Sequence, residues 1–366
     1  MKKYVKDAVK ELQDSDKTKI IITLKSKNDY KKNILRLLYN KFILSIQKKI
    51  VPAHIKNFIL GTTGMKIGYD VCIPHDIFLD PYFPELIYLE KGSLIGGASE
   101  VHTHQIKRNK LTLGKVILKE RTLAGGISVL MPGSVINKNS ILSAYSNLDK
   151  EIPENELWWG MPAKLVKKFS EEDIEKYFRS SDGNYKEYYK SFKKKVKDFI
   201  RDPKQNYLSV YYNGKRLNAG DDWWRARNFF RIWYNGIIIE FTRLLPHCWL
   251  KTLLLRMAGV KIGKNVTISK GVVFDHIFCD NITLEDNVFL EDNVYLDGHD
   301  YTITKSAFGK TLIKKGVHIK SNSWLATGTE IGENTVIEPN SAASRVIPAN
   351  EVWGGNPAKL IEKLKQ

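Results

Sequence analysis

The chain has 366 residues, 43% of them hydrophobic, which is enough material for two or three domains with buried cores. Its formal net charge of +18 points to an anionic partner such as a polyphosphorylated small molecule or phospholipid headgroups, and no nucleic-acid-binding signature accompanies it. No run of 18 uncharged apolar residues predicts a membrane-spanning helix, and the lysine-rich N-terminus lacks the apolar core of a signal peptide. The three cysteines lack CxxC spacing and are expected to be reduced, as in a cytosolic protein.

The first 60 residues form a basic segment that is expected to be helical. Leu38, Phe42, Ile46 and Ile50 are spaced by four, as on one helical face. Two interpretations are open for this segment and for its counterpart at 229–255. Such helices cover the edge of the domain that follows, or they lie on a membrane surface, since they mix apolar and cationic residues. The sequence favours the first interpretation.

An apolar or small residue recurs at every sixth position in two long stretches. Helices have a period of 3.6 residues and strands a period of 2, so a period of six indicates a coiled β-solenoid in which each short strand sends one side chain inward. Gly, Asn and Asp fill the turns, where a positive φ is needed. The recurring positions are Ile67, Ile73, Leu79, Leu89, Ile95, Val101, Leu118, Ala124, Leu130, Ile136, Leu142 and Leu148, then Leu284, Leu290, Leu296, Ile313, Ile319, Leu325, Ile331, Ile337 and Ala343.

The two stretches belong to one unit that occurs twice, with a constant offset of 195 residues. Lys66 returns as Lys261, for example, and His104 returns as His299. The chain is therefore predicted to contain a basic helical segment (1–60), a first solenoid unit (61–168), an aromatic and basic connector with a helical segment (169–255) and a second solenoid unit (256–366). The sequence indicates no role for the connector.

Three features carry a resemblance to a known family: the six-residue periodicity, a histidine where a loop interrupts it, and a closing IPxNExWxGxPAKL pattern at 152–165 and 347–360. The chain resembles the hexapeptide-repeat acyltransferases, which fold as left-handed parallel β-helices. The resemblance covers about 65–165 and 260–360. It implies a mainly β fold with two such domains in tandem, and transfer of an acyl group from acyl-CoA to a hydroxyl or an amine.

His104 and His299 are the candidate general bases. An imidazole titrates near neutral pH, which suits proton abstraction from a sugar hydroxyl. A lone histidine beside a loop is more often a surface residue, but the repetition in both units and the family pattern favour catalysis. His102 has no counterpart in the second unit, where Asp297 takes its place, so His104 is preferred.

A general base also needs a group that orients its other ring nitrogen. Asp80 and Asp275 occupy matching positions one or two coils before the histidines and are candidates for this role. An aspartate that merely closes a turn is the more ordinary interpretation of both.

The resemblance further implies a set of acyl-CoA contacts. In the family, main-chain amides of the coils after the loop stabilise the oxyanion, small residues there accommodate the pantetheine, and a basic residue of the closing motif meets the phosphates. The matching positions are Gly125, Gly126, Lys164 and Lys167 in the first unit and Ser321, Ser323, Ser344 and Lys359 in the second.

We therefore predict a cytoplasmic O-acyltransferase that uses acetyl-CoA and acts on a sugar of a surface polysaccharide or its precursor. The resemblance implies a homotrimer, a sugar or glycan acceptor and no metal. Peripheral contact with the inner face of the membrane stays open. Two alternative functions also stay open: N-acetylation of an amino or nucleotide sugar, and a solenoid scaffold with one inactive unit. The loop at 105–113 is basic and the loop at 300–308 is not, so we expect unequal sites, with His299 as the dominant base.

Overall fold

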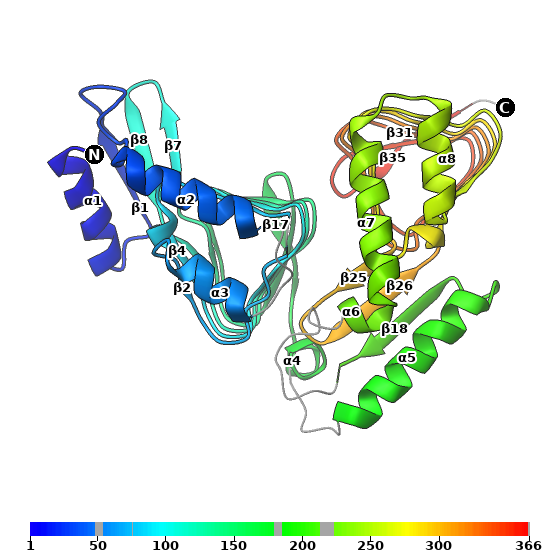
Figure 1. The fold of residues 1–366 in the computed structure, drawn as a ribbon, viewed down its shortest axis with the longest axis horizontal. Coiled ribbons are helices and arrows are strands. Elements are labelled where there is room, and N and C mark those ends of the chain that lie inside the picture. The colour runs from blue at the N-terminus through cyan, green and yellow to red at the C-terminus, as the bar shows by residue number, and fades with distance from the viewer. Residues whose placement is uncertain (48–53, 75, 179–184, 213–222, 365–366) are drawn as a thin grey trace. The chain divides into compact units, whose positions relative to one another are not determined.

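Short strands arranged around three flat faces form the central part of each half of this protein. The computed structural model describes residues 1–47, 54–74, 76–178, 185–212 and 223–364 (Figure 1). The chain divides into two compact units, the first built from Met1–Ser180 and the second from most of the residues after Ser181. Each unit carries one left-handed parallel β-helix, so the fold predicted from the six-residue period is confirmed.

In the first β-helix the chain visits three faces in rotation. The first face holds β2 (Lys66–Ile67), β4 (Ile87–Leu89), β9 (Val116–Leu118), β12 (Val135–Ile136) and β15 (Glu151–Ile152). The second face holds β5 (Leu94–Ile95), β10 (Leu123–Ala124), β13 (Ile141–Leu142), β16 (Glu156–Gly160) and, antiparallel at its edge, β17 (Ala163–Lys168). The third face holds β3 (Phe78–Leu79), β6 (Glu100–Val101), β11 (Val129–Leu130) and β14 (Asn147–Leu148).

The second β-helix repeats this order. Its first face holds β19 (Lys261–Ile262), β22 (Ile282–Leu284), β27 (Thr311–Ile313), β30 (Glu330–Ile331) and β33 (Val346–Ile347). Its second face holds β20 (Thr267–Ile268), β23 (Phe289–Leu290), β28 (His318–Ile319), β31 (Val336–Ile337), β34 (Glu351–Gly354) and the antiparallel β35 (Lys359–Lys363). Its third face holds β21 (Val273–Phe274), β24 (Tyr295–Leu296), β29 (Trp324–Leu325) and β32 (Ala342–Ala343). Short 3-10 helices, η1 (Pro84–Leu86) and η3 (Cys279–Asn281), precede β4 and β22.

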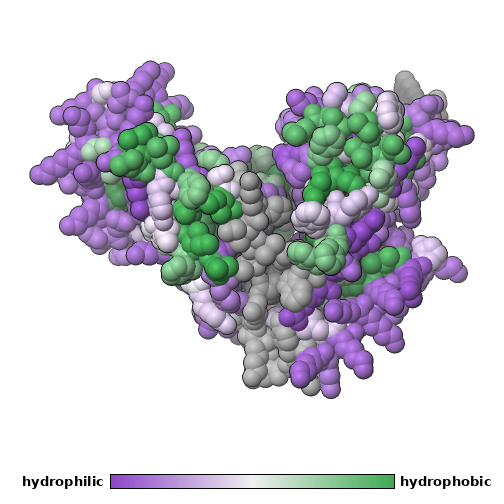
Figure 2. Space-filling view, viewed as in Figure 1, coloured by the Kyte–Doolittle hydropathy of each residue, from purple (hydrophilic) through white to green (hydrophobic). Residues whose placement is uncertain are grey.

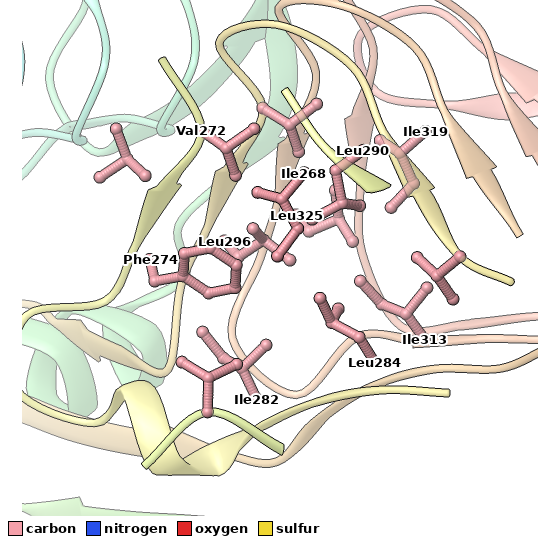
Figure 3. Packing of buried hydrophobic residues seen from close by; sticks show 14 of the residues in the cluster. Ile268, Val272, Phe274, Ile282, Leu284, Leu290, Leu296, Ile313, Ile319 and Leu325 are labelled. Carbon is pink, nitrogen blue, oxygen red and sulfur yellow. The ribbon is translucent and has the colours of Figure 1, made fainter. Parts of the chain in front are cut away.

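The residues of the six-residue period line the interior of each β-helix. Figure 3 shows Leu284, Leu290 and Leu296, one from each face, pointing into the core, and all three are buried. The parallel register places Leu290 beside Ile319, so side chains of similar size stack in columns from coil to coil. Each such burial contributes about 1.5–3 kcal/mol. The turns use the predicted asparagines, as at Asn287 with a φ of 60°.

A hairpin leaves each β-helix at the candidate histidine, and an earlier segment of the chain pairs with it. In the first unit, β1 (Lys19–Thr23) joins β7 (His104–Lys107) and β8 (Lys110–Gly114). In the second unit, β18 (Tyr207–Tyr211) joins β25 (His299–Tyr301) and β26 (Lys305–Gly309) in the same order.

A helix covers each of these small sheets. Helix α1 (Lys3–Asp14) packs Val5 and Leu12 against Leu113 of β8. Helix α5 (Tyr185–Arg201) brings the ring of Phe192 to 6.0 Å from the ring of Phe308 in β26. The connector therefore supplies the helix and strand that begin the second unit, just as the N-terminal segment begins the first. Two shorter helices, α4 (Glu171–Phe178) and α6 (Trp223–Ala226), complete it.

Two helices cap the open end of each β-helix. They are α2 (Ile34–Gln47) and α3 (His54–Gly61) in the first unit, and α7 (Phe229–Leu244) and α8 (Trp249–Ala258) in the second. The buried Lys56 donates from Nζ to the carbonyl of Pro74 at 2.6 Å, and the buried Lys251 donates to the carbonyl of Ser269 at 2.5 Å. Burial lowers the pKa of both ammonium groups to about 8. None of the helices described is long and apolar enough to cross a membrane.

Candidate active site

His104 begins strand β7, at the corner where the chain leaves the third face of the first β-helix. Its Nδ1 lies 2.5 Å from Oδ2 of Asp80, a carboxylate that is 1% exposed. Asp80 also accepts hydrogen bonds from the backbone N–H and the hydroxyl of Thr103, at 3.1 and 2.8 Å, and from the N–H of Tyr82 at 2.8 Å. These bonds fix the carboxylate, and the carboxylate fixes the plane of the imidazole.

His299 begins strand β25 at the equivalent corner, and its Nδ1 is hydrogen-bonded to the buried carboxylate of Asp275. Asp275 accepts four backbone N–H bonds as well, from Ile277 at 2.8 Å, Phe278 at 2.6 Å, Gly298 at 2.8 Å and His299 at 3.0 Å. The structure thus places each candidate base against the aspartate named as its orienting candidate.

The second ring nitrogen of each histidine is open. An ionised carboxylate only accepts hydrogen bonds, so in the neutral ring Nδ1 carries the proton and Nε2 carries the lone pair. Across the described residues no hydrogen bond is made to Nε2 of His104 or His299. Their side chains are 18% and 24% exposed, so a substrate hydroxyl can reach them.

The two members of the second pair shift each other's pKa. Burial raises the pKa of Asp275, but the charge and hydrogen bond of His299, together with the backbone donors, lower it to about 2. Burial lowers the pKa of His299, yet the charge of Asp275 raises it above the ordinary value of 6.5. Burial raises the pKa of Asp80 as well, but the hydrogen bond and charge of His104, together with the bonds from Tyr82 and Thr103, lower it below its ordinary value. Both aspartates therefore stay ionised at neutral pH.

Aromatic rings surround the first histidine. The rings of Tyr82, Phe83 and Tyr30 lie 5.1, 5.4 and 5.8 Å from the ring of His104. Tyr30 comes from the N-terminal segment, which therefore contributes to the site as well as to the hairpin sheet. No pattern in the sequence around Tyr30 indicates this, because the contact depends on how β1 is paired.

The surroundings of the second histidine are different. The ring of Tyr301 lies 4.8 Å from that of His299, and a carboxyl group lies nearby at Asp297. Trp324 donates from Nε1 to Oδ2 of Asp297 at 2.6 Å. Burial and the charge of Asp275 raise the pKa of Asp297 to about 8, although the bond from Trp324 opposes the shift. In the sequence Asp297 appears only as the residue that replaces a histidine, and no pattern there indicates its hydrogen bond with Trp324.

The small residues predicted to contact acyl-CoA lie at a different corner from the histidines. Gly125 and Gly126 follow β10, at the corner between the second and third faces. Ser321 and Ser323 occupy the same corner of the second β-helix, where Ser321 donates from its N–H and its hydroxyl to Glu291, at 3.0 and 2.7 Å. One whole face separates this corner from the histidine corner of the same β-helix.

The remaining predicted residues fall into two groups. Ser344 follows β32 at the histidine corner, two coils beyond β24. Lys164 and Lys359 are exposed on the terminal strands β17 and β35. Lys167 is also exposed on β17, but its ammonium group donates to Asp173 at 2.8 Å. Among the described residues, no group of three or more His, Cys, Asp or Glu side chains is placed to hold a metal ion.

Comparisons with known proteins identify the family of the chain. No protein-family model matches the chain. A Staphylococcus aureus (strain MRSA252) protein named as an acetyltransferase is 30% identical over 131 residues, which cover 36% of this chain and 78% of that protein. The chain belongs to the hexapeptide-repeat acetyltransferases. YvoF of Bacillus subtilis (strain 168), also named as an acetyltransferase, is 28% identical to this acetyltransferase over 134 residues, with the same two coverages of 36% and 78%.

A longer match involves a much larger protein. The delta-poly-L-ornithine synthetase of Acinetobacter baumannii (strain AB307-0294) is 23% identical over 363 residues, which cover 83% of this acetyltransferase but 27% of the synthetase. Among solved structures, a hexapeptide-repeat acetyltransferase of Vibrio cholerae O1 biovar eltor, complexed with acetyl coenzyme A, aligns with a TM-score of 0.32 and 14% identity, over 37% of this chain and 88% of that one.

Proposed function

We propose that this acetyltransferase transfers an acetyl group from acetyl-CoA to a hydroxyl group of a sugar, with His104 and His299 as the general bases of two sites. One observation carries the proposal: the same aspartate–histidine pair occurs at the same corner of both β-helices, with Nε2 of the histidine open. Asp275 and Asp80 hold Nδ1 protonated, so each base presents its lone pair outward.

The transfer balances with these groups alone. As the acceptor oxygen attacks the carbonyl carbon of the thioester, its proton moves to Nε2 and a C–O bond forms. The carbonyl oxygen becomes an oxyanion, which main-chain N–H groups stabilise. When the C–S bond breaks, the imidazolium returns the proton to the leaving thiolate. The carboxylate of Asp275 stabilises the imidazolium between the two steps, because it stays ionised at its pKa of about 2.

Exposed lysines suit the phosphates of acetyl-CoA. The ammonium groups of Lys164 and Lys359 stand on equivalent edge strands, and in both β-helices the closing motif supplies them. An ammonium group acts on a phosphate as a compact point charge. We assign Lys167 a smaller role, since its ammonium is bound to Asp173. Ser321 is less available for the same reason, because Glu291 accepts both of its donors.

The rings beside the histidines support a sugar acceptor. Sugar rings have apolar C–H faces, and Tyr30 and Tyr82 beside His104, or Tyr301 beside His299, offer aromatic surfaces of that size. The hairpin next to His104 carries exposed cations at 107–110, whereas the carboxylate of Asp300 lies near His299. We infer that the first site prefers an anionic acceptor, such as a nucleotide sugar, and the second a neutral one.

We also propose that the protein works as a homotrimer in which another copy completes each site. The support is the separation of the histidine corner from the corner that carries Gly125 and Gly126. Sedimentation velocity should give three times the chain mass of 42.0 kDa. A monomer with full activity would contradict this part of the proposal.

The experiment that tests the function measures CoA release from acetyl-CoA with a panel of sugars, amino sugars and nucleotide sugars. The product is then treated with mild alkali, which cleaves an acetyl ester but leaves an acetamide intact. We expect acceptor-dependent CoA release and an alkali-labile product. An alkali-stable product would show N-acetylation instead, and the absence of transfer to every acceptor would argue for a scaffold.

A further inference from the structure

The helices that cap each β-helix have a second face that packs against nothing in the described structure. One side of α2 and α3 buries Leu37, Ile43 and Leu60 against the first coil. The opposite side is also apolar but exposed, with Leu35 at 73% and Phe58 at 76%. We name this side the first apolar face, formed by Ile34, Leu35, Leu38, Phe42, Ile55 and Phe58.

Helices α7 and α8 repeat this feature in the second unit. Phe230 is 77% exposed and Trp249 is 76% exposed. The second apolar face is formed by Phe229, Phe230, Trp233, Ile237, Trp249 and Leu253. Figure 2 shows hydrophobic side chains gathered on the surface over α2 and α3 and over α7 and α8. Large exposed apolar patches of this kind usually mark a binding surface.

Five of the six positions of the two faces correspond, while Trp249 matches His54 and Ile55 matches Leu250. With the offset of 195 residues, Leu35 matches Phe230 and Leu38 matches Trp233, and all four are exposed. At these five positions the residues differ between the copies, but all of them are apolar. An exposed position that contacts only water could be polar in either copy. The shared apolar character therefore indicates that both faces contact a partner.

The charges on the four helices identify the chemistry of that partner. They carry seven Lys and Arg residues, of which Lys56 and Lys251 are buried, and one acidic residue, Glu240, which is 3.0 Å from His276 and 3.6 Å from Arg243. Arg36 lies over the ring of Tyr39 at 5.3 Å, and Arg231 repeats this over Tyr234 at 5.5 Å. Helices with Trp, Phe and Leu on one side, cations beside them and almost no acidic residues are typical of the membrane interface.

We propose that both apolar faces dock on the surface of an anionic lipid bilayer, without crossing it. Pairing of the same face between two copies of this chain is disfavoured, because it would bring Arg36 against Arg36 in an isologous contact. Capping and membrane docking do not exclude each other. The buried side of each helix pair covers the β-helix, and the exposed side faces the membrane. None of the residues of the two apolar faces belongs to the aspartate–histidine pairs, so membrane docking does not depend on the proposed reaction.

The test is co-sedimentation of the full chain with vesicles of phosphatidylcholine alone or mixed with phosphatidylglycerol. We expect binding to the anionic vesicles that weakens as salt rises, and little binding to neutral ones. The double variants Leu35→Ser/Phe58→Ser and Phe230→Ser/Trp233→Ser should each lower the affinity about tenfold or more, because each removes two inserted side chains. Val346→Ser, which removes an exposed apolar side chain from β33, is the matched control and should bind normally.

Sedimentation of the same variants without vesicles separates the alternatives. The proposal holds if the variants keep the wild-type mass and melting temperature while losing vesicle binding. It fails if the wild-type protein does not co-sediment with anionic vesicles. It also fails if the double variants dissociate a wild-type oligomer, because a second copy would then cover these faces.

Discussion

Replacing Asp275 by Asn separates the orienting role of the carboxylate from the size of the side chain. The carboxylate accepts bonds on both oxygens: Ile277 and Phe278 donate to Oδ1, while Gly298, His299 and the imidazole Nδ1 donate to Oδ2. An asparagine offers one accepting oxygen and one NH2 group. One of these two sets of donors must therefore face another donor.

The magnitude follows from those contacts. A buried donor left without a partner costs about 1–3 kcal/mol, so the loss of two backbone partners lowers the free energy of unfolding by roughly 2–6 kcal/mol. The effect on the reaction is of similar size, because His299 loses the group that holds its tautomer, and we expect kcat/KM of the second site to fall by about 10²–10⁴.

The pH profile adds a readout that a purely structural loss would not produce. Asp275 raises the pKa of His299, so the acid limb of kcat/KM in the wild-type second site lies above pH 6.5, the ordinary value of the imidazole. Without the carboxylate His299 loses the largest of the influences that raise its pKa, so that pKa falls. The acid limb should then move to lower pH even as the rate falls.

The assay follows CoA release in the His104→Ala background, where the second site alone turns over. Asp286→Asn is the matched control, because this carboxylate also accepts a backbone bond, from Lys264 at 2.6 Å, but in a turn away from the histidine corner. The reasoning is refuted if Asp275→Asn folds, keeps most of its kcat/KM and leaves the acid limb where it was.

Two further predictions concern the co-substrate and the connector. Lys359→Ala should raise KM for acetyl-CoA more than it lowers kcat, and Lys363→Ala on the same strand is the control. An unchanged KM in Lys359→Ala would mean that the phosphates of acetyl-CoA bind at another place. Val210→Asp puts a charge into the buried side of β18 and should destabilise the second unit by about 3–5 kcal/mol. Ser209→Asp, on the exposed side of the same strand, should leave the stability unchanged. Equal melting temperatures for the two variants would contradict the role given to the connector.

The β-helices could be predicted from the sequence because their signal is local. Each coil repeats an inward apolar residue and a turn residue, and Leu290 or Asn287 shows its role through spacing alone. The hairpin sheets could not be predicted in this way. Lys19 of β1 pairs with Gly114, and Tyr207 of β18 pairs with Gly309. These equivalent strands are therefore 188 residues apart, so the offset of 195 that relates the two β-helices does not relate β1 to β18.

The candidate site was predictable to the same extent. The histidines stand at breaks in a local pattern, and the aspartates precede them at matching positions in both units. The contacts of His104 with Tyr30, and of Asp297 with Trp324, join residues that are far apart along the chain. Only the pairing of strands and the stacking of coils brings them together, and neither residue pair carries a signal of its own.

The most direct test of the central claim compares acetyl transfer by the variants His104→Ala, His299→Ala and the double variant on several acceptors. We expect each single variant to keep one site with its own acceptor preference, and the double variant to lose about 10²–10⁴ in kcat. His318→Ala, which removes an imidazole bound to Glu291 at 2.7 Å, is the control and should retain activity. A double variant that turns over at nearly the wild-type rate would contradict the assignment of the two histidines as general bases.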